Sequence, residues 1–366
     1  MATRIARVDF DARTASLVVK PSSAGLDSGR VREIVAALKT AGMQQVDVHV
    51  DAGPEASQAD GLRAALGDAG VLVHQGDYAG SVGRVGNRAF QCAVDPDEAR
   101  AGWTIEACLD SLDRAVVRSA LLVALVRLAT NMNDMLGGQL RFAVHELVAN
   151  AVDHADFSGS APRIELAILA TPSTTLLSYR DNAGPFTTTT PPLVDIDVKI
   201  ARGERRGLGL FMLNRMAQQV RYRRDGDWNE TTVLFVRTGN ETQNARRSSM
   251  EGLELKQTPC KLPNTVVLKP VGSIDSTTVH VLDARLNALA SQAGAQIVLD
   301  MSEVDFISSA GVGLFLGTVS QLRTTGGDLI FTGMLPAILE VFEIINLSAY
   351  FRIVPSLEAL EPAPRG

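Results

Sequence analysis

The sequence predicts a multidomain protein of mixed α/β and α+β class, and three observations lead to this. A chain of 366 residues is long enough for two or three domains. Short alternating apolar segments, typical of strands, take turns with segments of helical period. Two segments poor in large apolar residues, 76–87 and 238–252, interrupt this pattern and are predicted to be linkers. The predicted domains are 1–80, 86–238 and 257–362, with a linker over 239–256.

The first predicted domain is a small α/β unit without a chemical motif. Two strands in a hairpin, a helix, a strand, a second helix and a final strand are expected over 5–11, 15–21, 29–42, 45–52, 58–70 and 71–75. His49 and His74 lie in apolar strands, where a core histidine is commoner than a metal ligand. A sensor, a docking module and a degenerate copy of the C-terminal domain remain open as its role.

The second predicted domain alternates elements around a central helix over 139–155. A strand and two helices are expected before it, over 88–95, 97–112 and 114–132. Two strands, a helix beginning near Gly209 and two closing strands are expected after it, over 163–170, 175–181, 209–220, 219–225 and 230–237. The helix at 114–132 is apolar around most of its circumference, which favours burial against a sheet.

The third predicted domain again alternates strands with helices. Its strands are expected over 265–272, 296–302, 328–333 and 351–354. Its helices are expected over 276–293, 307–326 and 334–346. This alternation predicts a sheet covered by helices.

Composition and charge exclude several function classes. A net charge of −6 and a pI near 5.5 argue against a sequence-independent grip on nucleic acid. Cys92, Cys108 and Cys260 are far apart, so neither a disulfide framework nor a zinc site is expected, and a reducing cytoplasm fits. The most apolar run begins at Ala120, is about half a membrane span and contains Arg127, so no membrane segment is expected.

Polar residues recur on one face of the helix at 139–155. Glu146, Asn150 and His154 are spaced four apart, among apolar neighbours that a core helix would bury. This pattern suggests a binding site, although a solvated face is an equally good interpretation of the helix by itself. Asp181 follows at the end of a predicted strand, and Gly207 and Gly209 precede a predicted helix.

Helix face, strand-end aspartate and glycine-rich loop, in this order, resemble the GHKL ATP-binding fold of gyrase, ninety-kilodalton heat-shock chaperones and histidine kinases. They resemble the anti-sigma-factor serine kinases of bacteria more closely. The resemblance implies a GHKL-type α/β sandwich that binds ATP and Mg²⁺. In it, Glu146 is the general base, Asn150 binds Mg²⁺ and His154 supports the wall of the site.

The same resemblance assigns roles to the other predicted site residues. Asp181 accepts a hydrogen bond from the adenine amino group, beside a turn that contains Gly184. Gly207 and Gly209 let the backbone approach the phosphates, and Arg206 pairs with phosphate oxygens, unless the basic loop is only solvated. One position departs from the family pattern, because Ala183 replaces the glycine two places after the aspartate.

The sequence around 299–317 resembles the signature of STAS domains, the anti-anti-sigma factors that anti-sigma kinases phosphorylate on serine. The register set by Phe306 and Gly311 places the phosphoacceptor at Ser309. Asp275 matches a second loop near that serine. Ser308 replaces the aspartate that often precedes the acceptor, and both serines also suit a helix start.

The two resemblances together imply a bacterial partner-switching regulator, in which an ATP-dependent serine kinase module is fused to an anti-anti-sigma domain. The expected partners are STAS-domain or sigma-factor-like proteins, and a homodimer through the kinase module stays open. A non-catalytic scaffold that sequesters partners, with or without nucleotide, is the main alternative. An ATP-hydrolysing switch is a weaker one.

Overall fold

The structure, a computed structural model of residues 1–366, falls into two compact units. The first comprises Met1–Thr187 and Ala217–Asn244, and the second comprises Thr188–Met216 and Ala245–Gly366. The residues that the structure describes are 4–10, 14–20, 28–40, 43–50, 71–75, 103–109, 111–130, 132, 134–157, 159–170, 174–185, 208–236, 252–258, 260, 262–344, 347–348 and 350–360. The mixed α/β class predicted from the sequence is confirmed.

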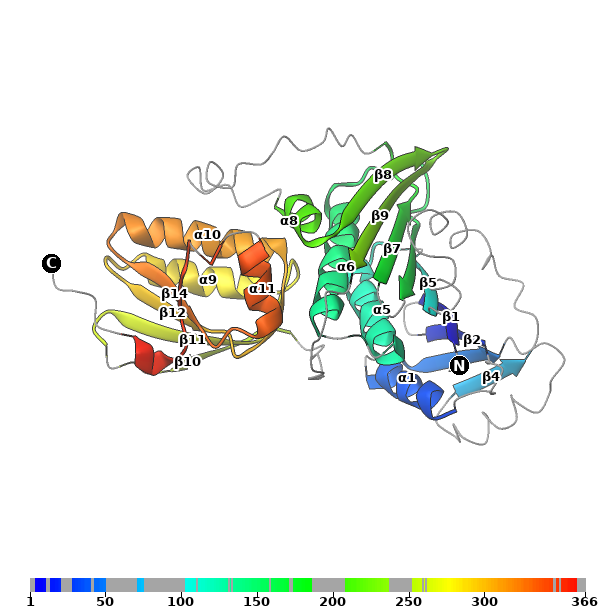
Figure 1. The fold of residues 1–366 in the computed structure, drawn as a ribbon, viewed down its shortest axis with the longest axis horizontal. Helices are drawn as coiled ribbons and strands as arrows, with labels where there is room; N and C mark the ends of the chain where they lie inside the picture. Colours follow the sequence, from blue (N-terminus) through cyan, green and yellow to red (C-terminus); the bar gives the residue numbers. More distant parts are fainter. Residues whose placement is uncertain are drawn as a thin grey trace. The chain divides into compact units, whose positions relative to one another are not determined.

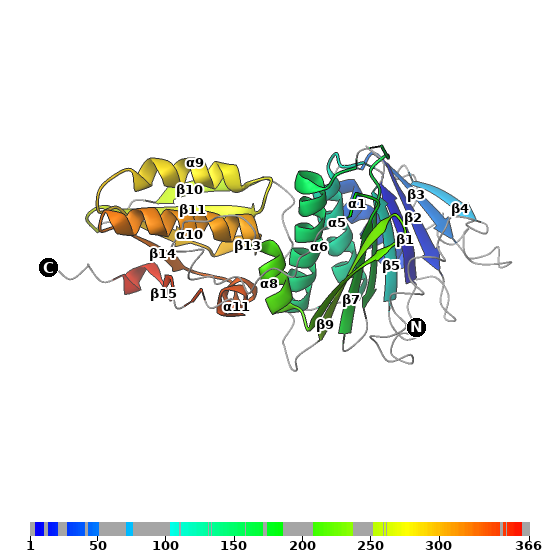
Figure 2. The ribbon, with the colours of Figure 1, turned by 90° about the horizontal axis from the view of Figure 1, so that it is seen from above.

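The first unit is built on one twisted sheet. Its nine described strands follow the order β4-β3-β2-β1-β5-β6-β7-β9-β8 (Figures 1 and 2). The strands are β1 (Arg4–Phe10), β2 (Thr14–Lys20), β3 (Gln45–Val50), β4 (Val71–Gln75), β5 (Trp103–Leu109), β6 (Ile164–Ala170), β7 (Thr174–Asp181), β8 (Gln219–Asp225) and β9 (Trp228–Val236). The strands from β5 to β8 pair antiparallel with their neighbours, whereas β1 pairs parallel with β5.

Three helices, α1 (Ser28–Thr40), α5 (Ala115–Thr130) and α6 (Asp134–His154), cover one face of this sheet (Figure 2). Helix α5 packs against both α1 and α6. Its side chains Leu121, Leu122, Leu125 and Val126 are all buried, as expected for a helix that is apolar around most of its circumference. Helix α6 packs against β7 and β9, which places the predicted site helix near the β8 end of the sheet.

The prediction of a helix over 97–112 was wrong for its described part, because Trp103–Leu109 is strand β5. Ile105, Ala107 and Leu109 alternate along this strand, and all three are buried. This period of two fits a strand with one face against the helices. Neighbours on both sides, β1 and β6, provide the hydrogen bonds that hold the segment extended.

The N-terminal region and the part that follows it share this sheet. Strand β1 pairs with β5 through Arg7 opposite Glu106, Val8 opposite Ala107 and Asp9 opposite Cys108. The predicted hairpin of the first strands is present, since β1 and β2 pair antiparallel. The boundary near residue 80 stays a prediction, but the strands on either side of it belong to one hydrogen-bonded sheet.

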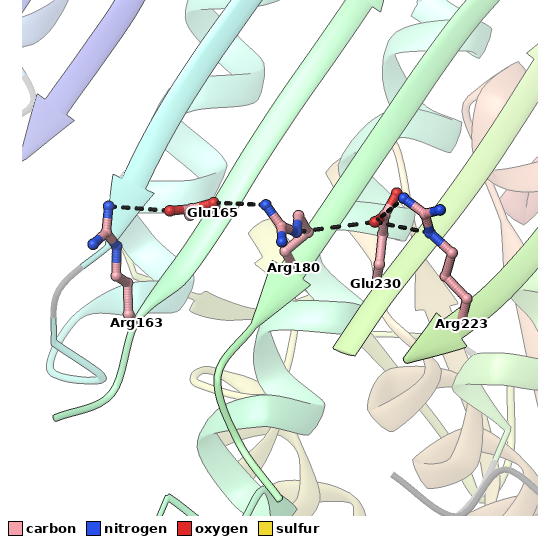
Figure 3. Close-up of polar contacts among 5 residues, drawn as sticks. All are labelled: Arg163, Glu165, Arg180, Arg223 and Glu230. Carbon is pink, nitrogen blue, oxygen red and sulfur yellow. Dashed lines mark hydrogen bonds and ion pairs between the residues drawn. The ribbon is translucent and has the colours of Figure 1, made fainter. Parts of the chain in front are cut away.

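A row of alternating charges crosses four strands of the sheet (Figure 3). Glu165 pairs with Arg163 at 3.0 Å and with Arg180 at 3.4 Å. Glu230, which is almost fully buried, pairs with Arg223 at 2.7 Å and with Arg180 at 3.9 Å. Each carboxylate therefore lies between two guanidinium groups, which offsets the cost of taking it out of water.

The second unit contains a smaller sheet and its helices (Figure 1). Its described strands follow the order β10-β11-β12-β14-β15, with β13 paired to β11. The strands are β10 (Glu254–Thr258), β11 (Thr265–Ile274), β12 (Gln296–Asp300), β13 (Glu303–Ile307), β14 (Asp328–Thr332) and β15 (Arg352–Val354). The helices are α8 (Gly209–Met216), α9 (Val279–Ala290), α10 (Ser309–Thr324) and α11 (Pro336–Ile344). Strand β10 begins inside the segment predicted as a linker.

Aromatic rings fill the core between β14 and the C-terminal helices. Phe331 lies edge-on to Phe315 and Phe351, with both centroid distances 5.0 Å, and to Phe342 at 5.6 Å. Such edge-to-face pairs add to the free energy gained by burying the rings.

None of the described helices of either unit combines the length and apolarity needed to cross a bilayer.

The start of α10 approaches the end of β11 closely at Gly311. A Cβ atom on Gly311 would lie 2.8 Å from Ile274 Cγ2 and 2.9 Å from Ile307 Cγ1. We expect Gly311→Ala to lower the free energy of unfolding of the second unit by about 1–3 kcal/mol, the usual cost of overpacking. Differential scanning calorimetry measures the change. Gly252→Ala is the control, because its Cβ would meet no described atom within 4 Å, and equal melting curves for both variants would contradict the prediction.

Candidate functional site

The polar face of α6 runs from the interior of the first unit to its surface. Glu146 is 5% exposed, Asn150 one turn later is half-buried, and His154 in the last turn is exposed. The spacing of four that the sequence predicted therefore produces a graded row on one helix. Asn150 makes no hydrogen bond to another described residue, so its amide is available to a ligand.

Asp181 is the last residue of β7, and its side chain is 7% exposed. Its Oδ1 atom accepts hydrogen bonds from the backbone N of Ala183 at 3.0 Å and from Nδ2 of Asn229 at 2.7 Å. Its Oδ2 atom accepts no hydrogen bond of standard geometry from the described residues, although the buried side chain of Tyr179 interacts with this carboxylate. One carboxylate oxygen is therefore fixed by the protein, and the other can accept a hydrogen bond from a ligand.

The turn after β7 is held from two sides. The backbone O of Ala183 accepts from Nη1 of Arg224 at 2.8 Å, and the backbone O of Gly184 accepts from Nδ2 of Asn229 at 3.0 Å. The backbone N of Gly184 donates to the O of Asp156, two residues after α6, at 2.7 Å. The turn after Asp181 is thereby bonded to the segment that follows the helix with Glu146.

The alanine that departs from the family pattern fits this turn. Ala183 is buried, and neither Ala183 nor Gly184 is among the described residues with a positive φ angle. A side chain at position 183 therefore meets no backbone strain, because only the left-handed region favours glycine. The turn forms with Ala183 in place.

Asn182 ties the same turn to the chain between α6 and β6. Its Oδ1 accepts from the backbone N of Arg163 at 2.8 Å, and its Nδ2 donates to the O of Ala161 at 2.9 Å. Both polar atoms of this side chain are used in bridging two loops. The end of β7 is therefore bonded to the connection between α6 and β6 on one side and to β9 on the other.

The sequence analysis missed Asn229, Tyr222 and Arg224. Asn229 is 3% exposed, and its Oδ1 accepts from the hydroxyl of Tyr222 and from Nη1 of Arg224, both at 2.8 Å. A signal was present, because asparagine is depleted in strands. Position 229 shares the inward face of β9 with the buried side chains of Val233 and Phe235. A polar residue on such a face needs a partner.

Of the three residues predicted in the glycine-rich loop, the structure describes one. Gly209 is buried and is the first residue of α8, within the second unit. Arg206 and Gly207 lie outside the described residues.

Ser309 is the first residue of α10, and its side chain is half-buried. Ser308 is the N-cap residue, but its hydroxyl is fully buried and makes no cap hydrogen bond. Asp275 lies in the loop after β11, where its Oδ1 accepts from the hydroxyl of Thr277 at 2.6 Å.

The described residues fit an adenine nucleotide with its metal ion. The Oδ2 atom of Asp181 is a charged acceptor for an exocyclic amino group. The amide oxygen of Asn150 is a ligand type that Mg²⁺ accepts. Bound there, the ion would neutralise phosphate charge.

Tyr179 lies on the same face of β7 as Asp181, two residues before it. Burial and the nearby charge of Asp181 raise the pKa of Tyr179 well above its usual value of 10.0. Its buried hydroxyl makes no hydrogen bond of standard geometry to a described residue. The folded protein therefore keeps this proton at a pH where the unfolded chain releases it.

We expect stability to depend on pH through Tyr179 above its usual pKa of 10.0. A raised folded-state pKa contributes stability below that value and loses it as pH rises toward the folded value, by up to about 1.4 kcal/mol per pH unit. The free energy of unfolding of the wild type should fall more steeply above this pH than that of Tyr179→Phe. Urea unfolding at several alkaline pH values tests this, and parallel curves for the two proteins would refute it.

Comparison with known proteins identifies both halves of this arrangement. Residues 110–235 match the family model of the histidine kinase-like ATPase domain, and residues 259–360 match that of the STAS domain. The first match contains Glu146, Asn150, Asp181 and Asn229, and the second contains Ser309.

Individual relatives are similar to about a quarter to a third of the chain. BtrV of Bordetella bronchiseptica, whose name classes it with anti-sigma factor antagonists, is 32% identical over 109 residues, which are 30% of this chain and 94% of BtrV. An anti-sigma-B factor antagonist of Bacillus subtilis is 30% identical over 84 residues, covering 23% of this chain and 76% of that protein. The solved structure of unphosphorylated SpoIIAA, an anti-sigma factor antagonist, is 24% identical, covering 29% of this chain and 92% of that one, with a TM-score of 0.26.

The family matches follow the order of the two sheets along the chain, and the similarity to BtrV extends over nearly its whole length. The chain therefore joins a histidine kinase-like ATPase domain to a C-terminal STAS domain and belongs to the family of anti-sigma factor antagonists.

Proposed function

We propose that this protein is a bacterial partner-switching regulator in which the ATPase domain is a Mg-ATP-dependent serine kinase. Its substrate is a serine of a STAS domain. One observation supports this most directly, namely that the buried carboxylate of Asp181 has one oxygen fixed and one open. The turn that follows it is bonded to the segment after α6, the helix that bears Glu146 and Asn150.

Each proposed role follows from the chemistry of its side chain. Asp181 holds the adenine amino group through Oδ2, and Asn150 gives its amide oxygen to Mg²⁺. Glu146 accepts the proton of the attacking serine hydroxyl while the serine oxygen bonds to the γ-phosphorus. The bond from that phosphorus to the bridging oxygen breaks, and its electron pair leaves with ADP. His154, Gly184, Arg206, Gly207 and Gly209 are proposed to complete the nucleotide site.

Ser309 is the proposed phosphoacceptor. It begins α10, where free backbone N–H groups and the helix dipole favour a dianionic phosphate. Its side chain is half-buried, whereas the hydroxyl of the preceding Ser308 is fully buried. Phosphorylation would add about two negative charges at this position without disturbing the core, and so change which partner binds there.

The proposed partners are STAS-domain and sigma-factor-like proteins. The relatives that this chain resembles are named as antagonists of anti-sigma factors. A kinase and a STAS domain in one chain meet at a high effective concentration, so a separate partner must compete with the tethered domain. A homodimer through the ATPase domain and a location in the cytoplasm belong to the same proposal.

The kinase reaction has a direct test in the full chain. After incubation with Mg-ATP, intact mass spectrometry should show one added phosphate, and peptide mapping should locate it at Ser309. Glu146→Gln should lower the rate of transfer at least about 100-fold, because general base catalysis contributes factors of that size. Ser309→Ala should remove the site.

Ser308→Ala is the matched control, since the neighbouring hydroxyl is buried. If wild-type chain remains unmodified, alone and with separate STAS proteins, the kinase proposal is wrong.

Nucleotide binding has a separate test that distinguishes the kinase from a non-catalytic scaffold. We expect Asp181→Asn to weaken Mg-ATP binding about 10- to 100-fold, since a hydrogen bond to a charged group contributes about 1.5–3 kcal/mol. Isothermal titration calorimetry measures the affinity. Glu146→Gln is the control and should bind Mg-ATP about as tightly as the wild type. Binding without any phosphoryl transfer would leave the scaffold as the function.

A further inference from the structure

We propose that Asn229 is a positioning residue for adenine recognition, acting through the carboxylate of Asp181. The inference rests on the proposed function, because it concerns how the nucleotide site selects its base. Asn229 lies directly opposite Asp181 in the register of β7 and β9. Its side chain is 3% exposed and points to the same face of the sheet as that of Asp181.

The amide nitrogen of Asn229 uses both of its hydrogens on the proposed site. It donates to Oδ1 of Asp181 at 2.7 Å and to the backbone O of Gly184 at 3.0 Å. A further approach to the O of Ala183 is longer, at 3.4 Å. One side chain therefore fixes the rotation of the carboxylate and the path of the turn that follows it.

The orientation of this amide is itself determined. Its Oδ1 accepts from the hydroxyl of Tyr222 and from Nη1 of Arg224, both at 2.8 Å. A flipped amide would put its oxygen against the carboxylate of Asp181 and its nitrogen against two donors. The native orientation is therefore the only one that satisfies all these groups.

Arg224 couples the same network to the turn backbone. The Nη1 atom that donates to Asn229 also donates to the O of Ala183 at 2.8 Å, and Nε donates to the O of Gly226 at 2.9 Å. The β8–β9 hairpin thus clamps the turn that contains Ala183. This contact is made at Ala183, the position at which the family that the sequence resembles has a glycine.

A fixed carboxylate has a consequence for specificity. Asn229 and the turn both donate to Oδ1, whereas no described residue donates to Oδ2 with standard geometry, so Oδ2 is the oxygen that can accept a hydrogen bond from the base beside Tyr179. If the carboxylate of Asp181 could rotate freely, Oδ2 would point toward the amino group of the base for only part of the time. Asn229 therefore contributes to the preference for a purine with a 6-amino group, whereas a purely structural role would affect all purines alike.

The test compares two nucleotides on the full chain. Isothermal titration calorimetry is run with Mg-ATP and with the Mg complex of purine riboside triphosphate, which lacks the 6-amino group. Asn229→Ala should weaken ATP binding about 10-fold or more and change binding of the analogue less than about 3-fold. Tyr222→Phe, which removes one donor to Asn229, should show the same selective loss at about 2- to 5-fold.

Thr232→Val is the matched control, on β9 but on the opposite face of the strand, and should leave both affinities unchanged. Should Asn229→Ala not fold, Tyr222→Phe decides by the same comparison. Equal weakening of both nucleotides, or no weakening of ATP, would overturn the inference while leaving nucleotide binding intact. Wild-type protein that binds neither nucleotide would overturn both the inference and the proposed function.

Discussion

The candidate site depends on the buried carboxylate of Asp181 and on the hydrogen bonds that stabilise its charge. Asp181 sits inside the first unit, where an unpartnered charge would cost several kcal/mol. Two hydrogen bonds to Oδ1, from Nδ2 of Asn229 and from the backbone N of Ala183, offset this cost. Those bonds require β7 and β9 to pair in their observed register, since a slip by one residue would turn Asn229 to the other face.

In the STAS domain, the feature that positions the predicted phosphoacceptor is the close packing of the N-terminus of α10. Gly311 lets α10 begin close against Ile274 at the end of β11, so the first helical residue is held near the loop that contains Asp275. The packing of this terminus is tight at Gly311 and at the buried Ser308, but Ser309 between them stays half-buried. The two adjacent serines therefore differ in burial, since Ser308 is fully buried and Ser309 is half-buried.

Local pattern was enough for much of the fold and for part of the site. The polar face of α6 and the position of Asp181 at the end of β7 follow from helical and strand periods that the sequence displays. The prediction of a helix over strand β5 was wrong, because Trp103 and Ala107 also fit helical spacing, and the pairing with β1 and β6 that holds the segment extended is not visible in the local sequence. Asn229 was missed because its partner Asp181 is 48 residues away along the chain, and strand register is not a local property.

The pairing of β1 with β5 has a mechanical consequence. With β1 in place, β5 is an interior strand whose backbone groups are bonded on both sides. Removing the N-terminal segment would turn β5 into a bare edge, open to association with other chains. The leading strands thus double as a shield for the ATPase sheet. Only two strands, β5 and β6, separate β1 from β7, the strand that ends at Asp181.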